Sequence, residues 1–323
     1  MKKINPPRLY TFLLGFVVAL PLLFLFTSMQ GKDGQIARVN FTDDKFPQDY
    51  KIVSPPIPDQ LDFAGEKVPL DNFEVKERID REFIVNTYYH SYMIISIKRA
   101  NRYFPVIEPV LKQYGIPDDF KYVAVIESGL SNVISPANAV GFWQFVEDTG
   151  RKYGLEINDE VDQRYDVQKS TEAACLYIKD AHDRFGSWTM AAASFNMGTN
   201  GVEKQMARQK TNNYYNLVLS DETSRYVARI IAMKTILQDP EKYGFDIKQE
   251  DLYPQLPVYH VTVSEPIPNL ADFAISKGVN YKILKLYNPW LRDIVLTNKE
   301  HKSYTIDFPV KGSIKIIDEL ENH

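Results

Sequence analysis

The feature that most constrains the fold is a helical spacing of apolar residues through the middle of this 323-residue chain. Val75, Ile79 and Phe83 lie four residues apart with charged residues between them, which is the pattern of an amphipathic helix. No convincing strand pattern occurs between residues 72 and 237. We therefore predict a mainly α protein whose central domain, residues 72–238, is helical. Further helices are expected over residues 93–104, 105–114, 117–129, 140–153, 168–182, 188–197 and 221–237.

The segment 117–129 is the most informative of these helices. It begins with Pro117 and two acids, which suit a first helical turn, and it stops at Gly129. Its second half is apolar on nearly every face, as expected of a helix enclosed by protein. Glu127 lies in the last turn, where burial and the negative end of the helix dipole both disfavour the charged form. Glutamates at helix ends are common, but this one is expected to have a raised pKa, which suits a general acid near neutral pH.

The N-terminal segment has the features of a membrane anchor. Lys2, Lys3 and Arg8 precede the apolar run 10–29, which is long enough to span a bilayer. Basic residues on its N-terminal side place that end in the cytoplasm, so the rest of the chain would be exported. Thr27 and Met29 make a poor cleavage site, which favours an uncleaved signal anchor at 1–29 over a removed signal peptide. Residues 30–71, with scattered prolines, are predicted to be a tether and lead-in.

A second, smaller domain is expected at the C-terminal end. Prolines at 240, 254 and 257 mark a linker over residues 239–257. Residues 259–263 alternate like a strand, 270–276 and 281–287 have the length and pattern of short helices, and 303–308 predict a closing strand. The segment 258–323 is therefore predicted to be a small α+β domain with the order βααβ.

Composition and motif searches exclude several classes of function. The formal net charge of −4 argues against a nucleic-acid partner, because nucleic-acid-binding proteins usually show a basic face. The single cysteine, Cys175, lies in an apolar run and is expected to be a buried structural thiol. The five histidines have no metal-ligand spacing, and neither a nucleophile elbow nor a phosphate-binding loop occurs. We expect no metal and no organic cofactor.

Four short blocks appear in a fixed order along the helical region. They are VIESGL at 125–130, SPANAVGFWQF at 135–145, SFNMG at 194–198 and ETSRYVARI at 222–230. Together they resemble the catalytic domain of lytic murein transglycosylases, nearest to the membrane-bound D type. The resemblance implies a lysozyme-like helical catalytic domain.

The C-terminal region resembles a LysM module, a class that binds glycan containing N-acetylglucosamine. The matching stretches are YHVTV at 259–263, LADFAISKGVNYKILKLYNPWL at 270–291 and SYTIDFP at 303–309. The Gly-Asp-Thr/Ser-Leu signature that usually follows the first strand is replaced by SEPIPNL. A degenerate module that only packs against the rest of the protein or acts as a spacer is therefore an equal alternative to a sugar-binding module.

Carried over to this sequence, the transglycosylase resemblance makes Glu127 the sole general acid/base. It also implies substrate-binding roles for six residues, which are Ser128, Ser135, Gln144, Phe145, Asn196 and Tyr226. Ser135 would bond near the acetamido sugar, and the hydroxyl of Tyr226 would lie near the catalytic carboxyl. Phe195 stands where the family usually has tyrosine, so one hydroxyl is absent from the expected wall.

The family's reaction needs only one carboxyl group. The enzymes cleave the β-1,4 bond from N-acetylmuramic acid to N-acetylglucosamine without water, and the muramic 6-hydroxyl closes a 1,6-anhydro ring. Other carboxylates that could pair with Glu127 are expected to be exposed helix charges or caps, and they are Glu147, Asp148, Asp162 and Asp166.

The expectation is therefore an inner-membrane, single-pass enzyme with its catalytic part in the periplasm of a Gram-negative envelope. Its partners would be peptidoglycan glycan strands and, through the N-terminal helix, the membrane. Two alternatives stay open, which are a hydrolase of goose-lysozyme type and a non-catalytic peptidoglycan-binding scaffold.

Overall fold

The structure is a computed structural model that describes residues 51–314, and residues from Ser54 onward form one compact unit. The predicted anchor at 1–29 and the tether up to residue 50 lie outside the described residues. Within residues 51–314, no helix combines the length and the apolar character needed to cross a membrane.

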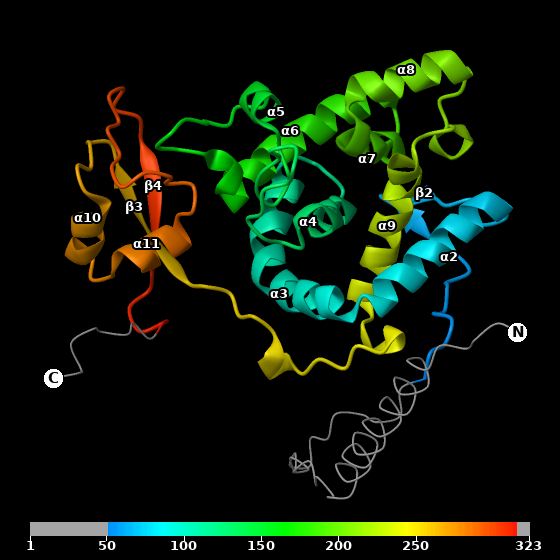
Figure 1. Cartoon of the computed structure of the whole chain (residues 1–323), viewed down its shortest axis with the longest axis horizontal. Coiled ribbons are helices and arrows are strands. Elements are labelled where there is room, and N and C mark those ends of the chain that lie inside the picture. Colours follow the sequence, from blue (N-terminus) through cyan, green and yellow to red (C-terminus); the bar gives the residue numbers. More distant parts are fainter. Residues whose placement is uncertain (1–50, 315–323) are drawn as a thin grey trace, which may run out of the picture. The chain divides into compact units, whose positions relative to one another are not determined.

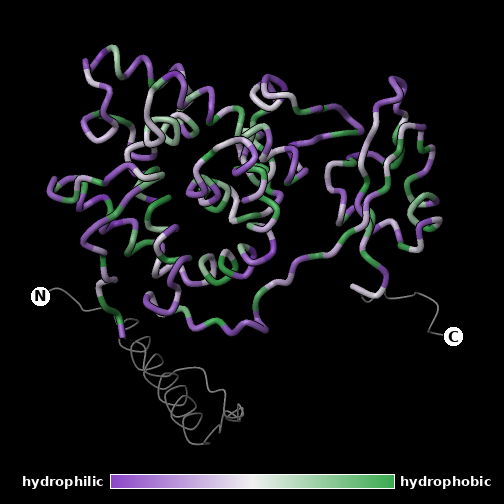
Figure 2. Tube along the Cα trace, turned by 180° about the vertical axis from the view of Figure 1, so that it is seen from behind, coloured by the Kyte–Doolittle hydropathy of each residue, from purple (hydrophilic) through white to green (hydrophobic). Residues whose placement is uncertain are grey.

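Helices make up most of the region between residues 73 and 251 (Figure 1). The α-helices are α2 Phe73–Tyr88, α3 His90–Gln113, α4 Lys121–Ser128, α5 Glu147–Lys152, α6 Val167–Phe185, α7 Trp188–Met197, α8 Thr199–Gln209 and α9 Asp221–Gln238. Three short 3-10 helices lie between them, which are η1 Asp118–Phe120, η2 Gln163–Tyr165 and η3 Tyr214–Asn216, and two more follow α9, which are η4 Glu241–Tyr243 and η5 Gln249–Asp251. The predicted mainly helical class is confirmed, and hydrophobic and hydrophilic residues alternate along the helices as amphipathic packing requires (Figure 2).

Side-chain caps set the helix starts that the sequence predicted. The side chain of Asn72 accepts hydrogen bonds from two backbone N–H groups in the first turn of α2. Asp166, Ser187 and Ser220 each accept one from the first turn of α6, α7 and α9. Each cap satisfies a donor that the helix itself leaves unpaired. The bounds of α7 and α9 consequently agree with the prediction to within one residue.

The prediction of two helices separated near Pro105 is wrong, because α3 continues through both Pro105 and Pro109. An internal proline removes a helical hydrogen bond and costs about 3 kcal/mol. Ile97 and Ala100 before Pro105, and Ile107 after it, are all buried in the same core. Packing both halves of the helix into one core offsets the local cost of the prolines.

The predicted helix over 140–153 is wrong in its first half, because only α5 is helical there. Val140 forms isolated bridges with Ile134 and Phe145, and Gln144 has a φ of 49°. Gly141 has a φ of 81°, and a Cβ on it would lie 2.0 Å from the carbonyl oxygen of Arg164. This close approach of two backbones turns residues 131–146 into a loop, which we call the cleft loop. The helix α8 was not predicted at all. Val202 is its one buried residue, so its sequence lacks the repeated apolar positions of an amphipathic helix.

The helical part packs around α4, which Figure 1 shows between α3 and α9. Val123, Ala124 and Val125 are fully buried, which confirms the prediction of an enclosed helix. Cys175 on α6 is also fully buried, and burial raises the pKa of its thiol to about 12, so the expectation of an inert structural cysteine is met.

The part of the lead-in that is described packs against the helices. β1 Asp62–Phe63 and β2 Glu66–Lys67 form an antiparallel hairpin. Each strand has two residues, which is too short for an alternating hydrophobic pattern to appear in the sequence. Phe63 is buried against Phe120, with ring centroids 5.0 Å apart. Glu66 accepts hydrogen bonds from the backbone of Trp188 and Thr189 at the start of α7. The hairpin therefore caps α7 of the helical region.

The C-terminal region has the predicted βααβ order. Its elements are β3 Val258–Val263, α10 Leu270–Ser276, α11 Tyr281–Tyr287 and β4 Tyr304–Pro309. The strands pair antiparallel, from Val258 opposite Pro309 to Val263 opposite Tyr304. The side chains between the sheet and its helices form a second core, distinct from the core around α4.

Candidate active site

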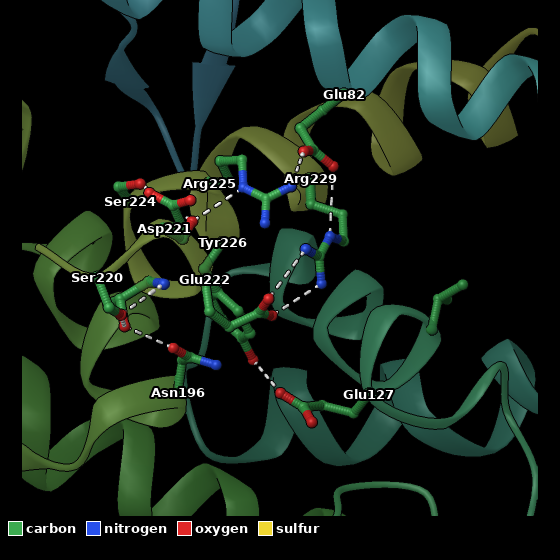
Figure 3. Close-up of polar contacts among 12 residues, drawn as sticks. Glu82, Glu127, Asn196, Ser220, Asp221, Glu222, Ser224, Arg225, Tyr226 and Arg229 are labelled. Carbon is green, nitrogen blue, oxygen red and sulfur yellow. Dashed lines mark hydrogen bonds and ion pairs between the residues drawn. The ribbon is translucent and has the colours of Figure 1, made fainter.

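Glu127 lies in the last turn of α4, at a cavity of about 520 Å³. The helix ends at Gly129, whose φ of 60° and whose N–H bond to the carbonyl of Val125 form a left-handed cap. This cap stops the helix just after Glu127. The Glu127 side chain is partly buried and its carboxyl group points toward Tyr226 of α9 (Figure 3).

The environment of Glu127 favours its protonated form. Burial raises the pKa of Glu127 to about 7, while the hydrogen bond from Tyr226 and the charge of Arg229 act in the opposite direction. The nearby carboxylate of Glu222 adds to the rise. The raised pKa predicted from the sequence is confirmed, with desolvation as its main cause. Near neutral pH the group can therefore both donate and accept a proton.

Tyr226 holds the carboxyl group in place. Its hydroxyl donates to Oε1 of Glu127 across 2.5 Å, and its ring is almost fully buried. Burial raises the pKa of Tyr226 well above its usual value, so the phenol stays protonated. It therefore serves Glu127 as a fixed donor, which favours the ionised carboxylate.

A charge network centred on the buried carboxylate of Glu82 joins α9 to α2 beside this pair (Figure 3). Glu82, whose side chain is 1% exposed, lies 3.3 Å from Arg229 and 3.5 Å from Arg225. Arg229 also binds Glu222, at 3.0 Å. The network fixes the helix that carries Tyr226. Sequence reasoning missed it, although Glu82 lies three residues after Ile79, where a helix with this apolar spacing faces the core.

The cavity walls come from the cleft loop, α5, α6, α7 and the start of α8. Phe195 lies at the centre of an aromatic group, with ring centroids 5.2 Å from Tyr177, 5.8 Å from Phe145 and 6.0 Å from Trp143. Tyr153 stacks edge-on against Tyr177 at 5.3 Å. Tyr153 and Tyr177 line the cavity, but no local sequence signal separated them from core tyrosines.

The structure brings three of the predicted binding residues to one wall. Ser135, Gln144 and Phe145 all belong to the cleft loop and line the cavity. The Ser135 hydroxyl accepts from the N–H of Ala139 at 3.0 Å, which closes a turn. The Gln144 amide nitrogen donates to the carbonyl of Gly141 at 2.7 Å. Both side chains therefore also stabilise the loop that presents them.

Asn196 lines the cavity from the end of α7. Its amide oxygen accepts from the hydroxyl of Thr223 at 2.7 Å, and Thr223 belongs to the first turn of α9. This bond fixes the orientation of the amide. Its NH2 group is consequently left as the donor for a bound molecule.

Ser128, predicted as a substrate-binding residue, is not among the residues that line the cavity. Its hydroxyl lies 3.0 Å from the carbonyl oxygens of both Ala124 and Phe142. It therefore ties the end of α4 to the cleft loop rather than facing the cavity.

The other acidic candidates are engaged away from Glu127. Glu147 pairs with Arg151 at 2.8 Å, and Asp162 pairs with Arg164 at 2.7 Å. Asp166 caps α6, while Asp148 is exposed. Among residues 51–314, Glu127 is the one carboxylic acid that lines this cavity. The same residues contain no cluster of acids, cysteines and histidines suited to a metal ion.

The raised pKa of Glu127 predicts a pH-dependent stability. In the folded protein Glu127 keeps its proton up to about pH 7, whereas the usual pKa of a glutamate side chain is 4.5. The stability contributed by this group is therefore fully present below the lower value and is lost as pH rises through the upper one. Glu127→Gln should match the wild type near pH 4 and be more stable by about 2–3 kcal/mol above pH 8, because it has no charge to bury. Thermal unfolding at both pH values checks this, and an equal difference at both would contradict it.

Comparison with known proteins places two domains on this chain. Residues 105–218 match the family described as the transglycosylase SLT domain. Residues 259–312 match the soluble lytic transglycosylase C-terminal LysM-like domain. The first match covers the segment from α3 to η3, which includes Glu127 and the cleft loop.

Two of the curated relatives match this chain with comparable identity. The membrane-bound lytic murein transglycosylase D of Escherichia coli (strain K12) is 28% identical over 243 residues, which cover 72% of this chain and 52% of the relative. A putative tributyltin chloride resistance protein of Alteromonas sp. (strain M-1) is 27% identical over 148 residues, 44% of this chain and 72% of the relative. This chain thus spans about half the length of the Escherichia coli protein.

Among solved structures, an inactive mutant of the lytic transglycosylase Slt from Pseudomonas aeruginosa aligns with a TM-score of 0.36 and 18% identity. The alignment covers 47% of this chain and 26% of that structure. The sequence matches, the first of which includes Glu127, Asn196 and the cleft loop, lead to the identification: this chain contains a transglycosylase SLT domain followed by a LysM-like domain of the soluble lytic transglycosylase type.

Proposed function

We propose that this protein is a lytic transglycosylase that cleaves the β-1,4 bond between N-acetylmuramic acid and N-acetylglucosamine in peptidoglycan. The observation that carries the proposal is the state of Glu127. It is a partly buried carboxyl group with a pKa of about 7, held by Tyr226, and no second acid among residues 51–314 lines its cavity.

The reaction divides into two proton transfers by the same group. Protonated Glu127 donates its proton to the glycosidic oxygen, and the bond from that oxygen to the muramic anomeric carbon breaks. The carboxylate then accepts the proton of the muramic 6-hydroxyl while that oxygen bonds to the anomeric carbon. The products are a free N-acetylglucosamine hydroxyl and a 1,6-anhydro ring, and Glu127 is protonated again. A pKa near the working pH suits a group that performs both steps.

The absence of a second carboxylate in the described cavity lining supports this reaction over ordinary hydrolysis. Most glycosidases use two carboxyl groups, with the second activating water or forming a covalent intermediate. In this proposal the substrate's own hydroxyl takes the place of water, and its acetamido group assists. A single general acid/base is then sufficient.

The cavity walls suit a chain of amino sugars. Phe145 and Phe195 offer apolar ring surface to sugar faces, while Ser135, Gln144 and Asn196 offer polar groups to the acetamido and hydroxyl substituents. We assign these residues to substrate binding. Ser128 instead supports the loop through its bonds to two carbonyl groups.

The proposed location follows from the N-terminal sequence. Residues 1–29 would anchor the chain in the inner membrane and leave residues 51–314 in the periplasm. Tethering would raise the concentration of the enzyme beside the glycan strands. Neither a metal nor an organic cofactor enters the proposed reaction.

The pH dependence of digestion tests the assigned acid. Release of soluble fragments from purified peptidoglycan is expected to fall above about pH 7, by roughly tenfold per pH unit once Glu127 is ionised. The fall reflects the loss of the protonated form. Glu127→Gln should show the same low background at every pH. A wild-type rate that stays constant from neutral pH to about two units above it would contradict the assignment.

A further inference from the structure

The second core of the protein extends beyond the C-terminal domain. Val140 of the cleft loop and Val161 and Tyr165 of the segment before α6 are buried with residues of that domain, such as Leu291. The guanidinium of Arg292 lies 3.9 Å from the centre of the Tyr165 ring. Three apolar side chains from the catalytic region therefore complete the core of the LysM-like domain.

Backbone hydrogen bonds join the same two regions. Val161 and Leu291 form an antiparallel bridge, the N–H of Asp162 donates to the carbonyl of Trp290 at 2.9 Å, and the N–H of Arg292 donates to the carbonyl of Glu160 at 2.7 Å. We call residues 156–166 the bridging segment.

Side chains reinforce both edges of the bridging segment. The Glu160 carboxylate accepts from the N–H of Thr297 at 2.6 Å. The hydroxyl of Tyr304 donates to the Glu156 carboxylate at 3.1 Å. Hydrogen bonds to charged groups are stronger than neutral ones, so these contacts favour a fixed interface over a loose one.

The bridging segment in turn holds the cleft loop. Arg164 and Asp162 form a two-point ion pair with bonds of 3.0 and 2.7 Å, and both side chains are 9% exposed. The remaining Arg164 nitrogen donates to the carbonyl of Phe145 at 3.3 Å and, more weakly, to that of Asn138 at 3.4 Å. Gly141 packs directly on the Arg164 backbone. Arg164 therefore links two positions of the cleft loop, Asn138 and Phe145, to the bridging segment.

The cleft loop depends on such support. Within residues 131–146 the structure shows only isolated bridges, and Gln144 adopts a φ of 49°. A loop without regular structure keeps such a conformation only when surrounding contacts determine it. The contacts described above run from the C-terminal domain to the bridging segment and then to this loop.

We propose that the C-terminal domain acts as a brace for the substrate-binding wall, with Val161 as the docking side chain and Arg164 as the positioning residue. The domain then contributes to cleavage of any glycan, including one too short to reach a second binding site. The expected effect on glycan cleavage rests on the proposed function, whereas the expected effect on the structure of the cleft loop does not.

The test uses the full chain and four variants. Val161→Asp places an unpaired carboxylate in the shared core, and Ile275→Asp is its matched control, because Ile275 is 69% exposed on α10 of the same domain. Arg164→Met removes the bonds to the loop, and Arg164→Lys keeps the charge. Hydrogen exchange is read at the N–H groups of Val140, Gly141 and Gln144, which bond within the loop. Exchange in α9 reports whether the helical domain stays folded.

Val161→Asp and Arg164→Met are expected to exchange these loop amides at least about tenfold faster, with α9 unchanged. For a short soluble glycan both should raise KM about tenfold or more and change kcat less, because the wall binds sugar and does not perform the chemistry. Arg164→Lys should recover part of the loss, and Ile275→Asp should match the wild type.

Loop protection equal to that of the wild type in both variants would overturn the brace. Faster loop exchange with unchanged KM would also overturn it, since the wall would then not depend on its support. If the wild type cleaves no glycan, the proposed function fails. The hydrogen-exchange measurement alone then decides whether the C-terminal domain braces the cleft loop.

Discussion

Glu127→Gln is expected to lower the rate of glycan cleavage by about 10³-fold or more while leaving the protein folded. Glutamine has nearly the same shape and its amide oxygen can still accept from Tyr226, which bonds to Glu127 at 2.5 Å. It has no acidic proton for the glycosidic oxygen and no carboxylate to accept the second proton. The same substitution therefore removes both halves of the proposed reaction. Fragment release from purified peptidoglycan, measured at pH about 6 where the wild type is protonated, gives the ratio.

The matched control is Glu147→Gln. Glu147 is an exposed acid on α5 that pairs with Arg151 and does not line the cavity. It should retain the wild-type rate, which would also argue against a second catalytic carboxylate there. A rate for Glu127→Gln within tenfold of the wild type would contradict the assignment of the acid.

Tyr226→Phe is expected to have the second-largest effect. It removes the hydroxyl that donates to Glu127 and leaves the buried ring, so the carboxyl loses its fixed orientation. A hydrogen bond to a charged group contributes about 1.5–3 kcal/mol, which corresponds to a pKa rise of roughly one to two units for Glu127. We expect the alkaline fall in activity to move to higher pH by about that amount, and the maximal rate to drop about 10- to 100-fold.

The control for this variant is Tyr253→Phe. Tyr253 is partly exposed, and its ring lies against Lys98 and Arg102 on α3. Its loss should change neither the rate nor the pH profile. An unshifted profile for Tyr226→Phe would show that this hydroxyl does not set the pKa of Glu127.

Local sequence patterns were sufficient for much of the fold. The starts of α6, α7 and α9 were predictable because Asp166, Ser187 and Ser220 are strong capping residues before apolar runs. The βααβ order of the C-terminal domain followed from alternation and short helical runs. The raised pKa of Glu127 was predictable because the apolar residues just before it on α4 mark a buried helix, and burial is the main cause of the rise.

The errors arise where distant contacts override local preference. The prolines of α3 predicted a break, but residues on both sides of Pro105 enter one core. The segment before α5 has helical spacing, yet Gly141 packs on the backbone of Arg164 and forms a loop. The pairing of Glu82 with Arg229 joins residues on α2 and α9, and no local pattern specifies such a partner.

The same limit applies to the cleft loop and the bridging segment. Val140, Val161 and Tyr165 lie within the sequence of the helical domain but belong to the core of the C-terminal one. Their apolar character is visible in the sequence, whereas the other residues of the core that they complete run from Ile267 to Phe308. Only the folded chain shows that the cleft loop and the LysM-like domain share contacts.

The most direct test of the central claim is digestion of purified peptidoglycan in water enriched in heavy oxygen, followed by mass spectrometry of the fragments. If the muramic 6-hydroxyl attacks the anomeric carbon, the new ends are 1,6-anhydro rings, lighter by one water than reducing ends and free of the heavy isotope. A hydrolase would instead place one heavy oxygen at each new reducing end. The proposed reaction predicts unlabelled anhydro ends that disappear with Glu127→Gln, and labelled reducing ends would contradict it.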